Sequence, residues 1–551
     1  MPNAAPRFAL PAPLESWALA LLLAVYLLVG ATGHLPWRGD DITYLGPIHA
    51  ILTGSGNWLL PEIAGEPLYD YPPLYFWVGA ALAKILAGLL PVHDAARLAS
   101  SVFTAAFLYW TGIAARRFHG PAAFSPAILL GIGSLGLVVH AHETQPMLAQ
   151  LAGMALCYAG LGQLAARPIR GGLEAGLGCG MAFLAGGLPG ALMTLPIMLA
   201  APLLCPTCRS RTVIVGLTAG LTIAALIGGS WLTGVALFHP GELALWWTDE
   251  LKNIFPHSLD LSDFGKLLQL LGWFAWPLWP IAGWAIWRNK HVLTTPPLAL
   301  PLMATLLAIL LVTMAGNLRA ASVLPVLPPL CLLAALGVAS LRRGAANAFD
   351  WFGVMAFSFF ALLVWLGWSA LHFGWPPGLA RQVAKMAPDF PGSGLGSGSA
   401  IGALLSIGML LLPMLTQRTP LRGTTNWALG MTLLWCLAVT LWQPWFAHTK
   451  NYQPVAAELK AILDKQEPNC IARKGLSDTQ RAALDYFADI RTKPKDKAAD
   501  CQMLLTYSVS SSTRIVRGEG TLVWERRLGG GRKAEIFRLY RRGLTQTAQS
   551  G

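Results

Sequence analysis

The sequence contains few charged residues: Asp, Glu, Lys and Arg make up 12% of its 551 residues, whereas hydrophobic residues make up 54%. Its mean hydropathy is +0.52. These values exclude an ordinary soluble domain. Apolar stretches of about 20 residues recur between residues 14 and 446, and each is long enough to cross roughly 30 Å of hydrocarbon as a helix. The composition therefore predicts a polytopic membrane protein.

Signals of several other protein classes are also missing. The first apolar stretch, SWALALLLAVYLLVGATGHL, exceeds the hydrophobic region of a signal peptide and lacks a convincing cleavage site, so we expect it to remain as the first span. The formal net charge of +13 does not indicate nucleic-acid binding, because many Arg and Lys residues lie in short loops between apolar runs. A single CxxC pair, Cys205 and Cys208, is weak evidence for zinc without a second pair, and a cytoplasmic loop is the preferred interpretation.

The positive charges between the apolar runs predict how the chain crosses the membrane. If the arginine-bearing ends face the cytoplasm, the N-terminus is inside, about thirteen spans alternate, and the C-terminal tail is outside. The segment 72–90 does not fit this alternation, so we expect a hydrophobic helix along the outer face, although a span remains an alternative. The spans are expected to start near residues 14, 97, 121, 146, 172, 188, 212, 265, 294, 320, 348, 400 and 424, and the arginine-bearing ends are those at Arg116/Arg117, Arg167/Arg170, Arg209/Arg211, Arg288/Lys290, Arg342/Arg343 and Arg418/Arg422.

The chain is expected to have two parts. Residues 1–448 form a transmembrane domain with a long external loop at 34–96, which is too long for a simple connection. Residues 449–551 have the strand and helix patterns of a small soluble α/β domain, which this topology places in the periplasm of a bacterium. There Cys470 and Cys501 either form a disulfide or remain two free thiols.

Three carboxylates are predicted at the outer boundary. Asp40 and Asp41 directly follow the first span, and Glu143 ends the third. A carboxylate there can accept a proton from an acceptor hydroxyl or amine, whereas the alternative is that Asp40 and Asp41 cap a helix and Glu143 simply faces water. His and Glu alternate in the HAHE stretch that ends at Glu143 and would not share a helical face, so we assign no metal to it; a divalent metal elsewhere stays open.

Aromatic and cationic residues at the same boundary suggest an anion-binding pocket. Tyr69 lies in PLYDYPPLYFW, which is interpreted either as a pocket wall that positions a lipid phosphate or as part of an aromatic belt. Arg97 and Arg319 lie at external ends of spans, where arginine is unusual. An anion partner would explain Arg97, whereas Arg319 either binds a phosphate or snorkels to the interface.

The order of these motifs resembles that of the bacterial aminoarabinose transferases within the protein O-mannosyltransferase superfamily. An acidic pair is followed by Tyr, then by a Trp-Pro-Gly-Pro pattern and by a diproline segment that ends in Trp. AARLASSVFTAAFLYWTGIAARRFHGP and LRAASVLPVLPPLCLLAA resemble further family segments. The matching residues of the first loop are Asp40, Asp41, Tyr44, Trp58, Pro61, Gly65, Pro67, Pro72, Pro73, Leu74 and Trp77.

The resemblance implies a GT-C fold with an active site on the outer face and a polyprenyl-phosphate-linked sugar as donor. It implies Asp40 as the catalytic carboxylate, Glu143 as the second acidic residue, and Arg97 as a ligand of the donor phosphate. Two cations of the family pattern are absent: Asp70–Tyr71 stands for Glu-Lys, and Gly186–Gly187 lies where Lys-Gly-Pro is expected.

The resulting hypothesis is a multi-pass glycosyltransferase of the bacterial inner membrane. Its predicted partners are membrane lipids, an undecaprenyl-phosphate-linked sugar donor and an acceptor that is lipid A or another envelope molecule. Asp40 would act as base in an inverting transfer, with Arg97, Arg319 and Tyr44 at the departing phosphate. The alternatives are a protein O-glycosyltransferase and a lipid or sugar transporter; the absence of clear repeats and the acidic residues at the outer boundary disfavour the transporter.

Overall fold

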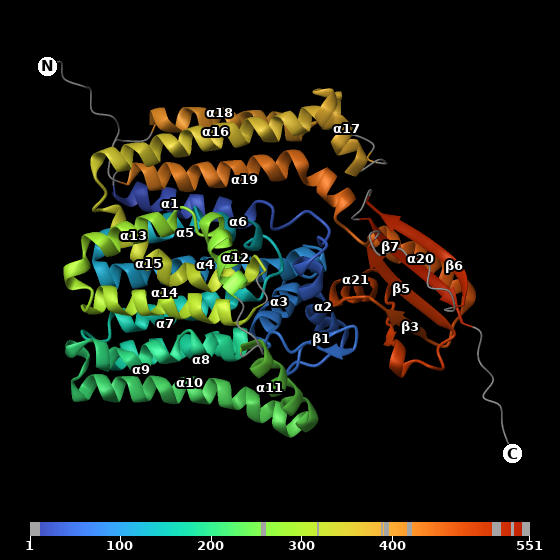
Figure 1. Ribbon diagram of the computed structural model, residues 1–551, viewed down its shortest axis with the longest axis horizontal. Coiled ribbons are helices and arrows are strands. Elements are labelled where there is room, and N and C mark those ends of the chain that lie inside the picture. Colours follow the sequence, from blue (N-terminus) through green and yellow to red (C-terminus); the bar gives the residue numbers. More distant parts are fainter. Residues whose placement is uncertain are drawn as a thin grey trace.

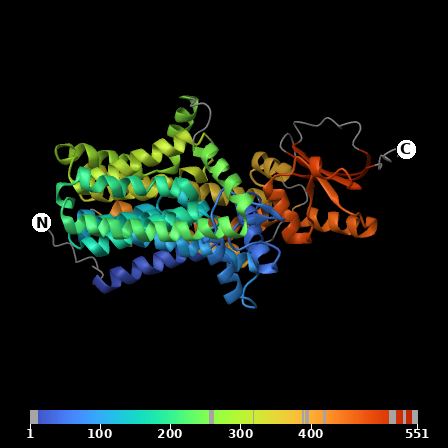
Figure 2. The same ribbon diagram turned by 90° about the horizontal axis from the view of Figure 1, so that it is seen from below.

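The computed structural model describes residues 12–254, 261–316, 319–386, 390, 396–415, 421–509, 520–529 and 534–542. Long helices lie side by side in a bundle, and a small domain built around a sheet lies beyond one end of it (Figure 1). The view from below shows the same division along the long axis (Figure 2). This is the predicted fold class, a helical membrane domain followed by a small α/β domain.

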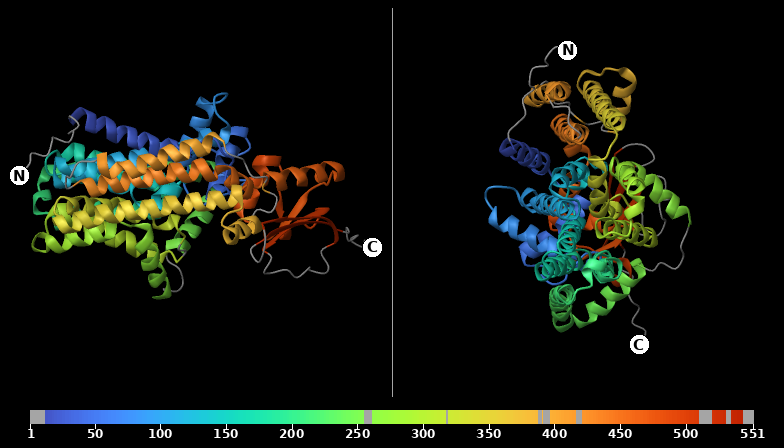
Figure 3. Two further views of the ribbon diagram at one scale, coloured as in Figure 1. Left: turned by 90° about the horizontal axis from the view of Figure 1, so that it is seen from above. Right: turned by 90° about the vertical axis from the view of Figure 1, so that its left-hand side faces the viewer.

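The bundle contains helices that are long and apolar enough to cross a membrane. Seven such helices occur among the described residues, with shorter apolar helices between them. Viewed along their axes, the helices form a compact cross-section (Figure 3). The predicted total of thirteen crossings stays a prediction. The bundle helices are α1 (Ala12–Leu28), α4 (Val92–His119), α5 (Phe124–Ile132), α7 (Met147–Gly162), α8 (Pro168–Leu192), α9 (Leu195–Leu204), α10 (Arg211–Phe238), α13 (Leu278–Arg288), α14 (Pro296–Met314), α15 (Leu327–Val338), α16 (Arg343–Phe373), α18 (Ser397–Leu415) and α19 (Arg422–Thr449).

The arginine-bearing helix ends lie together at the end of the bundle that is away from the small domain (Figure 1). α4 ends just after Arg116 and Arg117, and α10 and α16 begin at Arg211 and Arg343. This clustering is the one that the positive-inside pattern predicts. Arg418 lies outside the described residues.

The chain reverses direction at Gly186 and Gly187, where a division between two spans was predicted. Gly187 has φ 59° and ψ −144°, a conformation that glycine adopts without steric cost. A Cβ on Gly190 would lie 2.0 Å from the carbonyl oxygen of Ala182, so the two arms approach through their backbones. The Thr194 hydroxyl contacts the Cys179 sulfur at 3.2 Å, which shows that the second arm returns along the first.

Two predicted spans are interrupted. The span expected from residue 121 breaks after α5, where Ser134 adopts an extended backbone (ψ 119°) and the Leu135 amide donates to the Trp276 carbonyl at 3.4 Å. Trp427 Nε1 donates to the Gly133 carbonyl at this break, at 2.7 Å. The span expected from residue 265 is divided before α13 by Pro277, which has no N–H for a helical hydrogen bond. The first break produces the short helix that ends at His140.

Short elements cover the end of the bundle that faces the small domain. α3 has 12 residues and therefore extends about 18 Å, less than the thickness of a bilayer core, and the predicted outer-face position of 72–90 stays a prediction. These elements are α2 (Asp40–Thr53), β1 (Glu62–Ile63), β2 (Glu66–Pro67), α3 (Leu74–Ile85), α6 (Leu135–His140), α11 (Pro240–Ile254), α12 (Leu261–Phe274) and α17 (Pro377–Met386).

The small domain is a five-stranded mixed sheet in the order β4-β3-β5-β7-β6, with β3 parallel to β4 and β5. Alternation along β5 buries Met503 and Leu505 under both helices and Leu504 on the other face. Cys470 and Cys501 form a disulfide, which decides between the two predicted states. The elements are α20 (Gln453–Gln466), β3 (Ile471–Lys474), α21 (Asp478–Ala488), β4 (Lys493–Pro494), β5 (Met503–Val509), β6 (Thr521–Leu528) and β7 (Glu535–Arg541).

Ion pairs fix the small domain onto the first external loop. Glu66 of the loop accepts from Arg473 at 2.7 Å and lies 3.1 Å from Arg481. Arg38, just before α2, pairs with Glu535 at 3.1 Å. The sheet domain thus lies over α2, the helix that begins with the two predicted aspartates.

Candidate active site

The two aspartates occupy the first turn of α2 and point in different directions. The N-cap is Gly39 at φ 117°, so neither Asp40 nor Asp41 is the cap, which corrects that alternative. Both carboxylates still lie where the helix dipole stabilises negative charge. Their environments differ sharply, because Asp40 is half-buried whereas Asp41 is 1% exposed.

Asp41 is a structural anchor. Its two oxygens accept hydrogen bonds from Arg97, from the Trp37 amide at 2.9 Å, and from the amide and hydroxyl of Thr144, both at 2.8 Å. Burial by itself would raise the pKa of Asp41, but Arg97 and the hydrogen bonds lower it to about 2. A carboxylate that is buried and held in this way is a weak base, so these contacts favour a structural role for Asp41, and its catalytic role stays a prediction.

Arg97 also takes a structural place. Its side chain is 0% exposed and pairs with Asp41 and Asp94, both at 2.9 Å. A further bond to the Ala31 carbonyl brings its hydrogen bonds to four, out of five available N–H groups. In this arrangement Arg97 does not present its charge to a donor phosphate, and it acts on the site only through Asp41.

Asp40 faces a different set of partners. The Gln145 side chain donates to Asp40 Oδ2 at 2.9 Å. Gln145 is held in turn, because its backbone amide donates to the hydroxyls of Tyr75 and Ser100, both at 3.2 Å. Within the part of the chain that the structure describes, no Lys or Arg side chain pairs with Asp40. Its carboxylate is therefore oriented but available.

Asp40, His140 and Glu143 form a cluster in which one ligand atom of each lies within 4.8 Å of the others. His140 Nδ1 lies 3.5 Å from Glu143 Oε2. The expectation from the alternation of His and Glu overlooked one pair, because His140 and Glu143 are three residues apart and side chains at that spacing lie on one side of the chain. His142 points away and contacts the carbonyls of Val138 and Tyr26.

If the protein uses a divalent metal, this cluster is a candidate site for it. Two carboxylates and an imidazole are a donor set that suits zinc or manganese. Asp40, His140 and Glu143 are the side chains that would hold such an ion, which would polarise an acceptor hydroxyl there.

Tyr44 lies next to Asp40 on α2, and its ring meets that of Tyr71 edge to face, with centroids 5.2 Å apart. Burial, together with Tyr71 and Asp40, raises the pKa of Tyr44, so its hydroxyl stays protonated. The exposed Arg319 acts electrostatically on both Tyr71 and Asp70. Tyr71 thus contacts the predicted residue Tyr44 and feels the charge of the predicted residue Arg319.

Tyr69 makes its side-chain contact with a different helix, α11. Its hydroxyl donates to Glu242 in the first turn of α11, so it ties the first loop to that helix and does not join Tyr44 and Arg319. Its predicted role at the donor phosphate stays a prediction.

Sequence reasoning missed Gln145 and Glu250, and it considered Tyr71 only as part of the PLYDYPPLYFW segment. Glu250 is a buried acid on α11 that packs against the turn at Gly187. Its position in the amphipathic stretch LALWWTDELKNI was the available signal, because its neighbours at helical spacing are apolar.

Glu250 predicts a pH-dependent stability. Burial, with a smaller contribution from Asp249 and Asp70, raises its pKa from 4.5 to about 8. The folded protein therefore holds this proton more tightly than the unfolded chain, and stability is full below about pH 4.5 and falls as pH rises through about 8. We expect Glu250→Gln to match the wild type at low pH and to be more stable above pH 8, by several kcal/mol at most, since each pKa unit is worth about 1.4 kcal/mol.

Thermal unfolding in detergent across this pH range measures the effect, with Glu458→Gln on the exposed face of α20 as the control. Parallel curves for Glu250→Gln and wild type at all pH values would contradict the assignment.

Known proteins that resemble this chain include aminoarabinose transferases. No family model matches the chain. Its curated relatives include undecaprenyl phosphate-alpha-4-amino-4-deoxy-L-arabinose arabinosyl transferases from Edwardsiella ictaluri (26% identity; 41% of each chain), Yersinia enterocolitica (22%; 68% of this chain and 70% of the relative) and Pseudomonas aeruginosa (27%; 60% of each chain). The aligned segments thus span from about two fifths to 70% of the relatives' lengths.

The solved structure of the aminoarabinose transferase ArnT from Cupriavidus metallidurans bound to undecaprenyl phosphate superimposes with a TM-score of 0.70 at 16% identity, over 96% of this chain and 98% of that one. The chain has the GT-C fold of the aminoarabinose transferases. The predicted resemblance to this group of glycosyltransferases is therefore confirmed, and so is the predicted character of a multi-span membrane protein.

Proposed function

We propose that the chain is a glycosyltransferase that moves a sugar from an undecaprenyl-phosphate-linked donor to an acceptor in the cell envelope. The observation that supports it most is the oriented carboxylate of Asp40, which lies beside Glu143 and His140 and close to Tyr44. The similar proteins are named for the transfer of 4-amino-4-deoxy-L-arabinose on undecaprenyl phosphate, and the solved neighbour binds undecaprenyl phosphate.

In the proposed reaction Asp40 accepts the proton of an acceptor hydroxyl or amine. The acceptor atom attacks the anomeric carbon from the face opposite the phosphate, the bond between that carbon and the phosphate oxygen breaks, and the configuration inverts. Undecaprenyl phosphate leaves with the electron pair. Glu143 and His140 orient the acceptor, because both lie within reach of the Asp40 carboxylate.

The departing phosphate gains negative charge, which needs donors that are not already committed to other groups. Arg319 is exposed and acts electrostatically on Tyr71, whereas Arg97 already forms ion pairs with two carboxylates. Arg319 with the hydroxyls of Tyr44 and Tyr71 therefore replaces Arg97 as the proposed phosphate site. Protonated tyrosines can donate to phosphate oxygens, and arginine binds phosphate through its planar fork.

The proposed setting is the inner membrane, with the site and the sheet domain in the periplasm. The clustering of arginine-bearing helix ends at the opposite end of the bundle supports this orientation. A lipid A acceptor fits it, since both substrates would then meet at the outer surface of one membrane.

Transfer is tested with purified protein in liposomes that contain undecaprenyl-phosphate-linked sugars, beginning with 4-amino-4-deoxy-L-arabinose. Mass spectrometry follows the carrier, lipid A and added protein. Loss of sugar from the carrier with a matching mass gain on lipid A supports the proposal. A mass gain on Ser or Thr of the added protein would show that the acceptor is a protein. Movement of an intact donor across the bilayer without bond cleavage would instead identify a transporter.

The phosphate assignment predicts the behaviour of Arg319→Ala. We expect KM for the donor to rise roughly tenfold or more, since a charged hydrogen bond is worth about 1.5–3 kcal/mol, while thermal stability stays unchanged. Steady-state kinetics with varied donor measures this. Arg381→Ala, which removes an exposed arginine from α17, is the control, and equal effects of the two variants would refute the assignment.

A further inference from the structure

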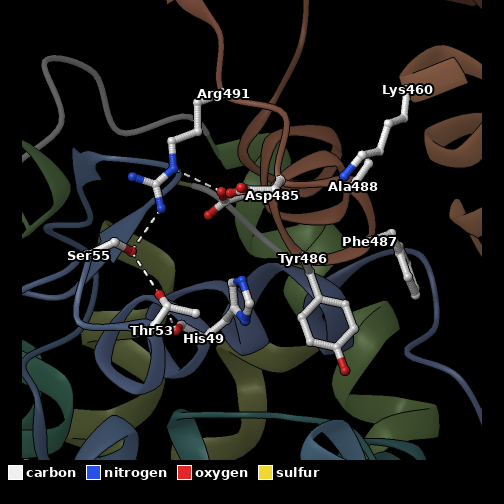
Figure 4. A pocket seen from close by; sticks show the side chains of 10 residues that line it. His49, Thr53, Ser55, Lys460, Asp485, Tyr486, Phe487, Ala488 and Arg491 are labelled. Atoms are coloured by element: carbon white, nitrogen blue, oxygen red, sulfur yellow. Dashed lines mark hydrogen bonds and ion pairs between the residues drawn. The ribbon is translucent and has the colours of Figure 1, made fainter. Parts of the chain in front are cut away.

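A cavity of about 500 Å³ lies between the first external loop and the sheet domain, apart from the cluster at Asp40. The C-terminal half of α2 contributes His49 and Thr53, and the end of α21 with the following turn contributes Asp485, Tyr486 and Asp489. Figure 4 shows His49 and Thr53 on one side of the space and Asp485 and Tyr486 on the other, with Lys460 of α20 beside them.

One wall of the cavity is held rigid by a chain of polar contacts. Arg491 donates to Asp485 Oδ1 at 2.9 Å and to Ser55 Oγ at 2.8 Å, and Ser55 contacts Thr53 at 2.9 Å (Figure 4). Asp485 is 2% exposed, yet its Oδ2 has no hydrogen-bond partner among the described residues. A buried carboxylate oxygen without a donor is costly, and a ligand that brings a donor would remove that cost.

The charges around the cavity balance. Lys460 and Arg491 contribute two positive charges, and Asp485 and Asp489 contribute two negative ones. Burial lowers the pKa of His49, so its ring stays neutral near pH 7. A polyanion would meet two carboxylates and a polycation would meet two cations, so the lining suits an uncharged ligand that is rich in donors and acceptors.

Two rings add an apolar surface to this polar lining. His49 and Tyr486 meet edge to face with centroids 5.2 Å apart, and both line the cavity. Hydroxyl groups that pair with carboxylates and cations, together with a C–H face that packs on an aromatic ring, are the features of a sugar.

The cavity is placed to contact a substrate of the proposed site. His49 follows Asp40 by nine residues on one helix, a separation of about 14 Å along the axis. The lining comes from α2 and from the sheet domain, so the cavity lies away from the bundle where the donor's isoprenoid tail would lie. This position favours the acceptor, rather than the donor, as the substrate that the cavity contacts.

We propose that this cavity binds a saccharide unit of the acceptor, beyond the group that reacts at Asp40. The assignment to the acceptor rests on the proposed function, whereas sugar binding itself does not.

Binding is tested by saturation-transfer NMR on the full-length protein in detergent. The probes are the methyl glycosides of glucose, galactose, mannose, glucosamine and N-acetylglucosamine. We expect saturation of at least one glycoside, with a loss of roughly tenfold in affinity for Asp489→Asn and for Lys460→Ala. Asp464→Asn and Lys465→Ala, which change exposed residues on α20 outside the cavity, should bind as the wild type does.

The same measurement in an Asp40→Asn background separates this inference from the proposed function, since binding should survive when transfer is lost. No binding of any glycoside, or equal losses in the α20 controls, would overturn the sugar site. In transfer assays the cavity variants should raise KM for the acceptor and leave KM for the donor unchanged. A rise in donor KM would show that the saccharide belongs to the donor and would overturn the assignment to the acceptor.

Discussion

Replacing Asp40 by Asn is expected to reduce transfer by roughly 10²-fold or more while the protein remains folded in the membrane. The amide has nearly the shape of the carboxylate but cannot accept a proton from the acceptor. Asp40 is half-buried, and among the described residues its side chain accepts one hydrogen bond, from Gln145, so little folding energy depends on its charge.

Single-turnover transfer from a lipid-linked sugar measures the effect, and thermal unfolding in detergent confirms that the variant is folded. Asp464→Asn makes the same chemical change on the exposed face of α20 and should transfer normally. Normal turnover of Asp40→Asn would leave Asp40 as a first-turn residue of α2 with no part in the chemistry.

The bundle could be predicted because hydropathy acts over the length of a whole helix. A stretch of about 20 apolar residues has few alternatives to crossing a bilayer, and Gly186–Gly187 marks a reversal because few other residues adopt that backbone. The interruptions were not predictable in the same way. At the break after α5 the Gly133 carbonyl accepts a hydrogen bond from Trp427, a residue almost 300 positions away in sequence.

The candidate site, too, could be predicted from the sequence only in part. Asp40 and Glu143 were expected on one side of the membrane, and the structure brings both into one cluster. His140 was set aside because only the alternate positions of HAHE were weighed, although His140 and Glu143 are three residues apart, a spacing that places two side chains on one helical face.

The roles of Asp41 and Arg97 were missed because spacing cannot show which of two adjacent aspartates turns inward. The pairing that decides it joins residues 56 positions apart. An arginine at a membrane boundary looks available for an anion until its buried partners are known.

The second large prediction concerns Arg97 and distinguishes a structural role for this residue from a role in binding the donor phosphate. Arg97→Gln leaves the carboxylates of Asp41 and Asp94 buried without their cation. Breaking a buried pair in this way costs about 3–5 kcal/mol, so we expect a large loss of thermal stability and a low yield of folded protein. A residue that only bound the donor phosphate would instead give a stable protein with a raised KM for the donor.

A second substitution sharpens the distinction. Adding Asp41→Asn removes one of the two uncompensated charges, so the double variant should recover part of the stability that Arg97→Gln loses. Unfolding midpoints of the wild type, both single variants and the double variant form a cycle whose coupling energy reports the pair. Arg319→Ala should show the opposite pattern, with intact stability and weak donor binding. Additive effects of Arg97→Gln and Asp41→Asn would mean that the buried pair does not hold α2 in place, and the orientation of Asp40 would then have to come from Gln145 alone.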